Sequence, residues 1–241
     1  MVGGRGVKDN ESDRHGDRAI NTKLGSDKGT GHRVSRPVTP VTGVILAGGR
    51  GSRMGGVDKG LVPFAGRPLV EWVIAALAPQ VDRLLISANR SLAAYRAYGH
   101  AVVTDLEPGY QGPLAGMLSA MRAADEGWIL TLPCDGPLAP PDLRARLADA
   151  LTAQRSEIAV ATDGRRTQFV HALLPVSLAP SLERFLASGE RRSADWYAGH
   201  RVALVDFGDQ AERFVNLNAP DEALDLERRL SALASQPPPS P

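Results

Sequence analysis

The sequence predicts an α/β domain in which a mostly parallel sheet carries helices on both faces. Strand-like and helix-like segments alternate along the chain, and the strand segments are apolar throughout, as in strands buried on both sides. With 241 residues and 43% hydrophobic content, the chain is long and apolar enough for one sizeable core. The expected architecture is therefore three-layered and Rossmann-like.

The expected strands are short runs rich in apolar residues, at 42–48, 81–89, 101–105, 128–135, 157–162, 170–175 and 202–207. The expected helices lie between or after them, at 67–80, 91–99, 113–125, 140–154 and 220–233. The apolar face of the first helix holds Leu69, Val70, Val73, Ala76 and Leu77. Pro79 marks the end of this helix, because proline removes a backbone donor and clashes with the preceding turn.

Both ends of the chain differ in composition from the middle. Residues 1–40 are rich in Gly and charged residues and have few apolar side chains, so we expect a disordered extension. Residues 234–241 are rich in proline and are expected to form a tail. This leaves residues 41–233 as a single domain.

Charge and cysteine content exclude some classes of partner. The formal net charge of +1 creates no overall field that favours nucleic acid or a membrane surface. Cys134 is the single cysteine, so an internal disulfide is excluded, and a reducing compartment fits. No apolar stretch approaches the roughly 18 residues of a membrane span. We therefore expect a cytoplasmic protein without a nucleic acid or membrane partner.

Ligands of parallel α/β sheets bind at the carboxyl ends of the strands. This rule selects three places: the glycine-rich loop at residues 46–60 after the first strand, Asp105 after the third and Asp135 after the fourth.

The glycine-rich loop reads LAGGRGSRMGGVDKG and favours an anion, because bare backbone N–H groups can converge on it beside Arg50, Arg53 and Lys59. It is not a P-loop, since Val57 stands where that motif needs lysine. It is not a dinucleotide fingerprint either, since Met54 takes the place of the third glycine. Phosphate is the expected ligand. A glycine-rich surface turn is the alternative interpretation of the loop, and ordinary solvated charges are the alternative for the three cations.

This loop, followed by GRPL and a helix, resembles the signature of the nucleotidyltransferases, and within them most closely the molybdenum cofactor guanylyltransferases. The likeness continues, in order, through SANR at 87–90, GPLAGMLSAM at 112–121, PCDGPLAPPDL at 133–143, GERR at 189–192 and FVNLNAPDEAL at 214–224. It covers about residues 42–230 and implies the nucleotide-diphospho-sugar-transferase type of fold.

The resemblance implies transfer of GMP from GTP to molybdopterin or its molybdenum-loaded form, with release of pyrophosphate and help from Mg²⁺. GTP and the molybdopterin cofactor are then the small-molecule substrates. Other cofactor-biosynthesis proteins and apo-molybdoenzymes are candidate partners. Two alternatives stay open: a cytidylyltransferase or sugar-phosphate nucleotidyltransferase with the same loop, or a non-catalytic carrier of the cofactor.

The resemblance assigns the catalytic roles to three residues. Lys59 matches the family lysine for the triphosphate, and Arg53 is the second cation. Asp135 matches the family metal ligand and can offer Mg²⁺ one oxygen while water and phosphate complete the octahedron. A helix-capping aspartate is the alternative interpretation of Asp135.

The nucleotide base is expected at the first part of the loop, where Leu46, Ala47, Gly48 and Gly49 match the base-binding segment of the family. Cytidylyltransferase relatives tend to read LAAG there, so Gly48 is the local argument for GTP over CTP.

Asp105 matches a second nucleotide-binding aspartate, or else caps a turn. Ser87 replaces an asparagine that many relatives have, and a hydroxyl lacks the two-sided amide, so the nearby Asn89 is expected to matter more.

For the pterin, Asn216 and Asn218 alternate along an extended stretch and so point to the same face. Arg191 and Arg192 are candidates for the pterin phosphate, with a solvated pair as the alternative. His171 is interpreted as a structural strand residue and Cys134 as a small packing residue.

Overall fold

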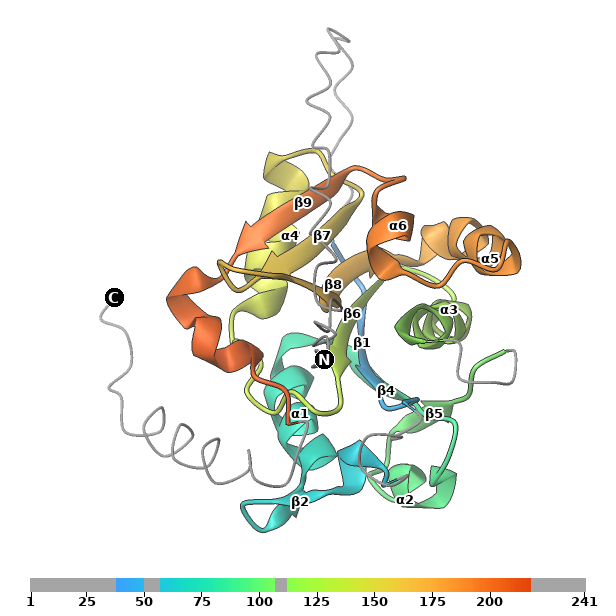
Figure 1. The fold of residues 1–241 in the computed structure, drawn as a ribbon, viewed down its shortest axis with the longest axis vertical. Helices are drawn as coiled ribbons and strands as arrows, with labels where there is room; N and C mark the ends of the chain where they lie inside the picture. The colour runs from blue at the N-terminus through green and yellow to red at the C-terminus, as the bar shows by residue number, and fades with distance from the viewer. Residues whose placement is uncertain (1–37, 50–56, 107–111, 218–241) are drawn as a thin grey trace, which may run out of the picture.

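The computed structural model of the chain describes residues 38–49, 57–106 and 112–217. In this part of the chain a seven-stranded sheet lies between two layers of helices (Figure 1). Its strands are β1 (Val41–Leu46), β4 (Arg83–Ser87), β5 (Ala101–Val103), β6 (Trp128–Pro133), β7 (Ile158–Thr162), β8 (Thr167–Pro175) and β9 (Val202–Asp206). A small separate hairpin consists of β2 (Pro63–Phe64) and β3 (Arg67–Pro68).

The strand order is β5-β4-β1-β6-β8-β7-β9, and only the pairs that include β8 are antiparallel. The last residue of β1, Leu46, lies opposite Ser87 of β4 and Pro133 of β6. The carboxyl ends of these three neighbouring strands therefore meet at one edge of the sheet. The prediction of a mostly parallel, Rossmann-like sheet is confirmed.

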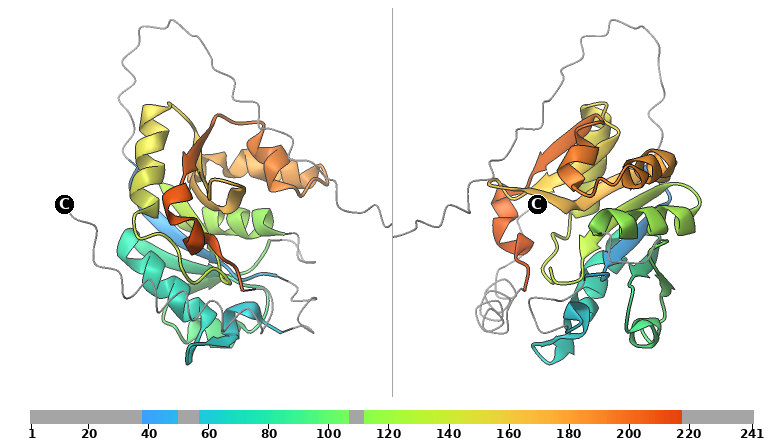
Figure 2. Two further views of the ribbon diagram at one scale, coloured as in Figure 1. Left: turned by 60° about the vertical axis from the view of Figure 1, so that its left-hand side comes forward. Right: turned by 45° about the vertical axis from the view of Figure 1, so that its right-hand side comes forward.

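The helices are α1 (Leu69–Leu77), α2 (Leu92–Arg96), α3 (Pro113–Ala124), α4 (Leu143–Ala153), α5 (Ala179–Ala187) and α6 (Ser193–Tyr197). Shorter 3₁₀ segments are η2 (Lys59–Leu61), η3 (Ala78–Gln80), η4 (Val176–Leu178) and η5 (Gly208–Phe214). Helices α1, α2 and α4 contribute to the core on one face of the sheet, and α3, α5 and α6 to the core on the other (Figure 2). The predicted three layers are therefore present.

Alternating side chains of the strands supply both cores. In β1, Ile45 packs with the cluster that contains Leu77 of α1, while its neighbour Val44 packs with Met117 of α3. All four side chains are fully buried. Complete burial of such a side chain stabilises the fold by about 1.5–3 kcal/mol, so each strand is held from both sides.

Helix α1 has the apolar face that the spacing predicts, since Leu69, Val70, Val73 and Leu77 are buried. Ala76 is only partly buried at the edge of this face. The helix ends at Leu77 and continues as the 3₁₀ segment that contains Pro79.

The sequence prediction was incomplete in the second half of the chain. Strand β8 begins at Thr167, earlier than expected, and runs antiparallel to its neighbours. Helices α5 and α6, segment η5 and the β2–β3 hairpin were not predicted. The expected helix at 220–233, the expected tail at 234–241 and all but residues 38–40 of the expected extension at 1–40 lie outside the described residues.

Among the helices that the structure describes, none has the length and apolarity needed to cross a lipid bilayer. Cys134 is buried, as expected of a packing residue, and burial raises the pKa of its thiol.

Candidate active site

The carboxyl ends of β1, β4 and β6 form the base of the candidate site. The backbone N–H of Ala47 donates to the carbonyl of Ser87 at 2.7 Å, and the N–H of Cys134 donates to the carbonyl of Leu46 at 3.1 Å. These bonds continue the sheet beyond its strands and fix the start of the glycine-rich loop. The predicted role of Leu46, Ala47, Gly48 and Gly49 in base binding is not tested by this geometry and stays a prediction.

Lys59 and Asp135 meet at this edge, although they lie 76 positions apart. The Nζ atom of Lys59, the first residue of η2, lies 3.0 Å from Oδ2 of Asp135, just beyond β6. The side chains are 24% and 15% exposed, so both groups face a partly open space. The N-cap of α4 is Asp142, which leaves no support for a helix-capping role of Asp135.

Asn89 and Asp105 form a second polar pair. Nδ2 of Asn89 donates to Oδ2 of Asp105 at 2.7 Å, and the backbone N–H of Asp105 donates to Oδ1 of Asn89 at 2.8 Å. Burial raises the pKa of the Asp105 carboxyl, and the bond from Asn89 opposes this shift. A Cβ atom on Gly48 would lie 3.0 Å from Nδ2 of Asn89, so this pair adjoins the loop.

Ser87 does not replace the missing asparagine at the loop. Its side chain is 1% exposed, and its Oγ lies 2.7 Å from where a Cβ atom of Gly116 in α3 would be. The hydroxyl therefore faces the helix layer, and Asn89 is the polar side chain that reaches Gly48.

Asn216 lies beside the Asp135 loop. Its Oδ1 atom is 3.1 Å from the position of a Cβ atom on Gly136, and the N–H of Leu217 donates to the carbonyl of Asp135 at 2.8 Å. A side chain at position 136 would displace Asn216, so the glycine permits this close approach. The structure thus places Asn216 beside the loop whose Asp135 pairs with Lys59.

His171 of β8 also borders Gly136. Its Nε2 atom is 3.9 Å from the same Cβ position, and the imidazole is 1% exposed. Burial lowers the pKa of His171 to about 3, so the ring is neutral at physiological pH. The Nδ1 atom has no hydrogen-bond partner among the described residues. The structural interpretation of His171 agrees with this burial, although the ring adjoins the site.

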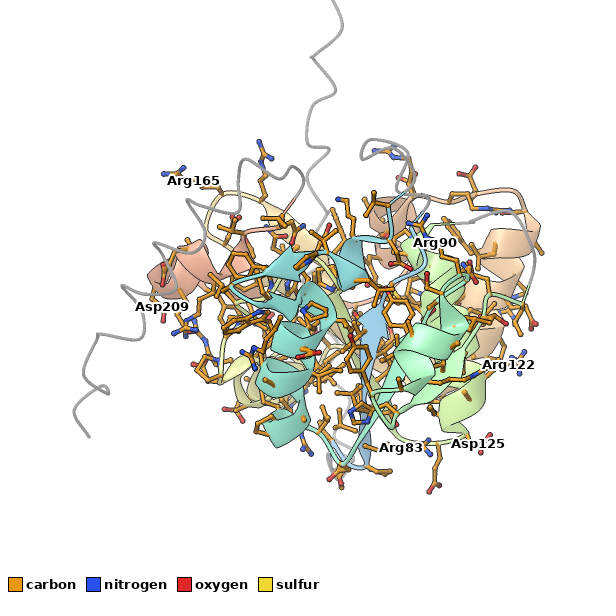
Figure 3. The ribbon with its side chains drawn as sticks, turned by 90° about the horizontal axis from the view of Figure 1, so that it is seen from below. Arg83, Arg90, Arg122, Asp125, Arg165 and Asp209 are labelled. Carbon is orange, nitrogen blue, oxygen red and sulfur yellow. The ribbon has the colours of Figure 1, made fainter. Side chains whose placement is uncertain are left out.

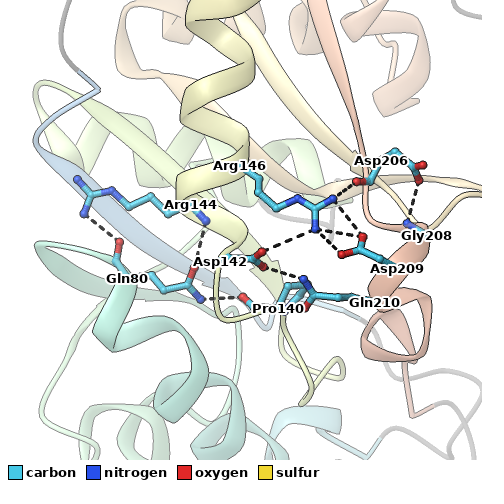
Figure 4. Close-up of polar contacts among 9 residues, drawn as sticks. All are labelled: Gln80, Pro140, Asp142, Arg144, Arg146, Asp206, Gly208, Asp209 and Gln210. Atoms are coloured by element: carbon cyan, nitrogen blue, oxygen red, sulfur yellow. Dashed lines mark hydrogen bonds and ion pairs between the residues drawn. The ribbon is translucent and has the colours of Figure 1, made fainter. Parts of the chain in front are cut away.

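Segment η5, which precedes Asn216, is fastened to α4 by side chains (Figure 4). The guanidinium of Arg146 pairs with Asp209, with an Nη1–Oδ2 distance of 2.9 Å, and also donates to the carbonyl of Asp206. Gln210 donates through Nε2 to Oδ1 of Asp142 at 3.0 Å. We call this network, Arg146–Asp206–Asp209 with Asp142–Gln210, the η5 latch.

Arg191 caps the end of α5. Its Nη1 atom donates to the carbonyls of Leu186 and Glu190 at 2.7 and 2.6 Å. Arg192 is 75% exposed on its side chain and lies 3.5 Å from Asp195. A role of Arg191 at the pterin phosphate stays a prediction, and Arg50, Arg53 and Asn218 lie outside the described residues.

The side chains that hold the segment just before Lys59 were not singled out from the sequence. Asp58, which precedes this lysine in the sequence, accepts a hydrogen bond from Tyr95 and forms an ion pair with Arg90. Arg90 was visible within the SANR motif, and Asp58 adjoins Lys59, but nothing in the spacing of Tyr95 connects it with the loop.

The described part of the chain contains no group of three or more His, Cys, Asp or Glu side chains that could hold a metal ion. The partly open Asp135 carboxylate suits a Mg²⁺ ion that takes one oxygen from the protein and the others from phosphate and water. The residues present therefore fit such an ion.

A family model described as the MobA-like NTP transferase domain matches residues 43–203. The chain belongs to this family. It is a nucleotidyltransferase, and every described site residue from Leu46 to Arg191 lies within the matched range.

Relatives with much higher similarity carry a more specific name. The molybdenum cofactor guanylyltransferase of Shewanella halifaxensis is 48% identical over 77% of this chain and 93% of its own length. The molybdenum cofactor guanylyltransferase of Cupriavidus taiwanensis is 50% identical over 78% and 97%. This nucleotidyltransferase is thus similar, over nearly their whole length, to guanylyltransferases.

Solved structures agree on the fold. The molybdopterin-guanine dinucleotide biosynthesis protein A of Archaeoglobus fulgidus gives a TM-score of 0.66 at 22% identity, covering 79% of this chain and 99% of its own. The 2-C-methyl-D-erythritol 4-phosphate cytidylyltransferase of Thermus thermophilus gives 0.59 at 19% identity, covering 78% and 98%. At such identities the likeness shows the fold alone, which enzymes for different nucleotides share.

Proposed function

We propose that this nucleotidyltransferase transfers GMP from GTP to the terminal phosphate of molybdopterin, or of its molybdenum-loaded form. The product is a molybdopterin guanine dinucleotide cofactor, and pyrophosphate is released. The observation that carries the proposal is the pairing of Lys59 with Asp135 at one edge of the sheet, with Asn216 beside the Asp135 loop, in a chain about half identical to guanylyltransferases.

The reaction needs positioning and charge more than a protein nucleophile. An oxygen of the acceptor phosphate attacks the α-phosphorus of GTP, and the bond from that phosphorus to the oxygen shared with the β-phosphate breaks. Negative charge then accumulates on the leaving pyrophosphate. A cation fixed beside this group stabilises the transition state more than the ground state.

Lys59 is placed for this role. Its ammonium is held at the edge of the sheet by Asp135, and one partly open ion pair can be exchanged for a phosphate oxygen at small cost. When Mg²⁺ is bound it would neutralise the phosphate oxygens, and Asp135 would hold it. Arg53 is proposed as a second cation for the triphosphate.

The base and the pterin would lie on opposite sides of this pair. Asn89, fixed by Asp105, adjoins Gly48 and would meet the nucleoside, together with the main chain of residues 46–49. Asn216 adjoins Gly136 and would meet the pterin, with Asn218 and Arg191 as further candidates. Action in the cytoplasm, with cofactor-biosynthesis proteins and apo-molybdoenzymes as partners, also stays a prediction.

A cytidylyltransferase is the second candidate, because the Thermus thermophilus structure shares the fold. Against it stands Gly48, since an alanine there would bring its Cβ atom to 3.0 Å from Asn89 Nδ2 and crowd the amide. A carrier without turnover is a third candidate, and it predicts nucleotide binding alone.

The test is pyrophosphate release by the purified protein with Mg²⁺ and a molybdopterin-bearing acceptor, with GTP compared against CTP, ATP and UTP. Acceptor-dependent release with GTP alone is the expected result. Release with CTP but not GTP would replace the assignment by a cytidylyltransferase. Binding of GTP without release from any nucleotide would favour the carrier.

A further inference from the structure

Tyr95 places a polar group in the interior, directly behind the segment that carries Lys59. Its side chain is 0% exposed and packs within the core cluster on the α1, α2 and α4 side. Its hydroxyl donates to Oδ1 of Asp58 at 2.5 Å, across 37 positions of sequence. A phenylalanine would fill the same volume in this core, so the hydroxyl is not explained by packing.

Asp58 is held a second time by Arg90. Its Oδ2 atom lies 3.6 Å from Nε of Arg90, and only 9% of the Asp58 side chain is exposed. The Nη2 atom of Arg90 donates to the carbonyl of Val57 at 2.7 Å. In Figure 3, Arg83 at the start of β4 lies near the lower edge of the molecule, while Arg90, three residues beyond the end of this strand, lies in the upper part.

The backbone of Gly60 also packs closely against Tyr95. A Cβ atom on this residue would lie 2.5 Å from the Tyr95 hydroxyl and 3.3 Å from Cβ of Cys134. Because a side chain cannot fit there, the backbone after Lys59 rests directly on the phenol and on the neighbour of Asp135. Val57, Asp58 and Gly60 are therefore all fixed by side chains of Arg90 and Tyr95, and Lys59 lies between them.

We propose that Tyr95 and Arg90 are positioning residues that hold Lys59, through Asp58 and the backbone of residues 57–60, in register with the triphosphate of the nucleotide. This rests on the proposed nucleotidyl transfer and adds the parts that orient its lysine. Neither residue needs to touch the substrate. They restrict where the ammonium can go, and a displacement of about 1 Å in such a group can cost on the order of 100-fold in rate.

The protonation states of Tyr95 and Arg90 suit side chains that hold Asp58 in place. Burial raises the pKa of the Tyr95 phenol, as do the nearby Cys134 and Asp58, so the hydroxyl keeps its proton and remains a donor. The Tyr95 hydroxyl donates to one carboxylate oxygen of Asp58, and such a charge-assisted bond is stronger than a neutral one, while the Arg90 guanidinium adds an ion pair 3.6 Å from the other oxygen.

The first test is Tyr95→Phe, with Tyr197→Phe as the matched control. Tyr197 is also fully buried, and its hydroxyl donates to the carbonyl of Phe169 at 2.9 Å in the core on the other face of the sheet. Both variants lose one buried phenol hydroxyl. Affinities for GTP and for GMP are measured by titration calorimetry, and kcat by acceptor-dependent pyrophosphate release.

Tyr95→Phe is expected to weaken GTP binding about 5-fold and to lower kcat about 10-fold, with GMP affinity unchanged, because a misplaced lysine affects only the distal phosphates. Tyr197→Phe is expected to change none of the three. Unchanged GTP affinity and kcat in Tyr95→Phe would overturn the proposal. Equal weakening of GTP and GMP would also overturn it, since a general loss of structure acts on both.

A combination with Lys59→Ala separates positioning from other roles. If Tyr95 acts through the lysine, adding Tyr95→Phe to Lys59→Ala leaves GTP affinity where Lys59→Ala alone put it. A further loss in the double variant contradicts the proposal. Arg90→Gln removes the ion pair from a partly exposed position and is used in the same scheme if Tyr95→Phe does not fold.

The binding ratio of GTP to GMP does not depend on turnover. A wild-type protein that binds GTP but releases no pyrophosphate would refute the proposed function, while the effect of Tyr95→Phe on this ratio would still decide the positioning role.

Discussion

The two halves of the candidate site, to which the proposed function assigns the nucleotide and the acceptor, are built in different ways. The nucleotide half consists of β5, β4, β1 and β6, and its polar side chains Lys59, Asn89 and Asp105 lie at or near parallel strand ends. The acceptor half consists of β8, β7, β9 and η5, with Asn216 as its polar side chain at the Asp135 loop. Strand geometry positions the first half, whereas the η5 latch positions the second.

In the proposed function, this difference separates the residues that catalyse nucleotidyl transfer from those that bind the acceptor. Changes in the nucleotide half should act on kcat and on the triphosphate, because its cation and carboxylate surround the reacting phosphorus in the proposed reaction. Changes in the acceptor half should act on the KM for molybdopterin and leave GTP binding alone. Three of the four predictions below test this division, and one, on His171, tests the burial of a side chain of the acceptor half; they run from the largest expected effect to the smallest.

Lys59→Ala should lower kcat by about 10³-fold, because it removes the cation that stabilises the leaving pyrophosphate. The side chain is 24% exposed, so thermal unfolding should stay near that of the wild type. Steady-state pyrophosphate release and circular dichroism melting measure the two quantities. Full activity in this variant would exclude Lys59 from the reaction.

Asp135→Asn should lower kcat by about 100-fold at fixed Mg²⁺ and shift the Mg²⁺ titration to higher concentration, since an amide is a weaker ligand than a carboxylate. Rates measured across a Mg²⁺ series, with the fold checked by near-UV circular dichroism, give the result. Kinetics and Mg²⁺ dependence equal to the wild type would leave Asp135 as a structural residue.

His171 makes stability depend on pH, because burial lowers its folded-state pKa to about 3 from an ordinary value near 6.5. Above pH 6.5 the imidazole is neutral in both the folded and the unfolded state, so it adds no pH dependence to the free energy of unfolding. Below pH 6.5 the unfolded state binds a proton that the folded state does not. The free energy of unfolding then falls by about 1.4 kcal/mol per pH unit, which is a tenfold change in the unfolding equilibrium constant, until about pH 3.

Urea unfolding of the wild type and of His171→Gln between pH 7 and pH 4.5 isolates this effect, because all other groups titrate in both proteins. The free energy of unfolding should depend more steeply on pH in the wild type than in the variant, by the amount that corresponds to the binding of one proton. Parallel slopes would show that the imidazole is protonated in the folded state.

Arg146→Met should raise the KM for the molybdopterin acceptor about 3- to 5-fold and leave the KM for GTP unchanged. The side chain is 29% exposed, and such ion pairs contribute about 1 kcal/mol or less, so the loosening of η5 is modest. Arg122→Met is the control, since Arg122 forms a comparable pair with Glu183 at 2.6 Å between α3 and α5. An equal effect on the KM for both substrates would show that η5 is not specific to the acceptor half.

The same division explains what could be predicted from the sequence. The end of a parallel strand is visible as the end of an apolar run, so the pattern of these runs was enough to group Lys59, Asp105 and Asp135. The antiparallel direction of β8 and the path of η5 leave no periodic signal, so the alternation of Asn216 and Asn218 indicated a shared face but not the closeness of Asn216 to Gly136. The contact of Tyr95 with Asp58 could not be predicted from the sequence, because it joins a short helix to a loop 37 positions away.

The bond from Leu217 to the carbonyl of Asp135 has a consequence for biosynthesis. All strands of the nucleotide half leave the ribosome well before residues 216 and 217 do. The strands of the proposed nucleotide site are therefore synthesised before the residues that form the wall next to Gly136. A premature stop between β9 and Asn216 would remove the bond from Leu217 to Asp135 and the Asn216 side chain beside Gly136, while every strand of the nucleotide half stays in the chain.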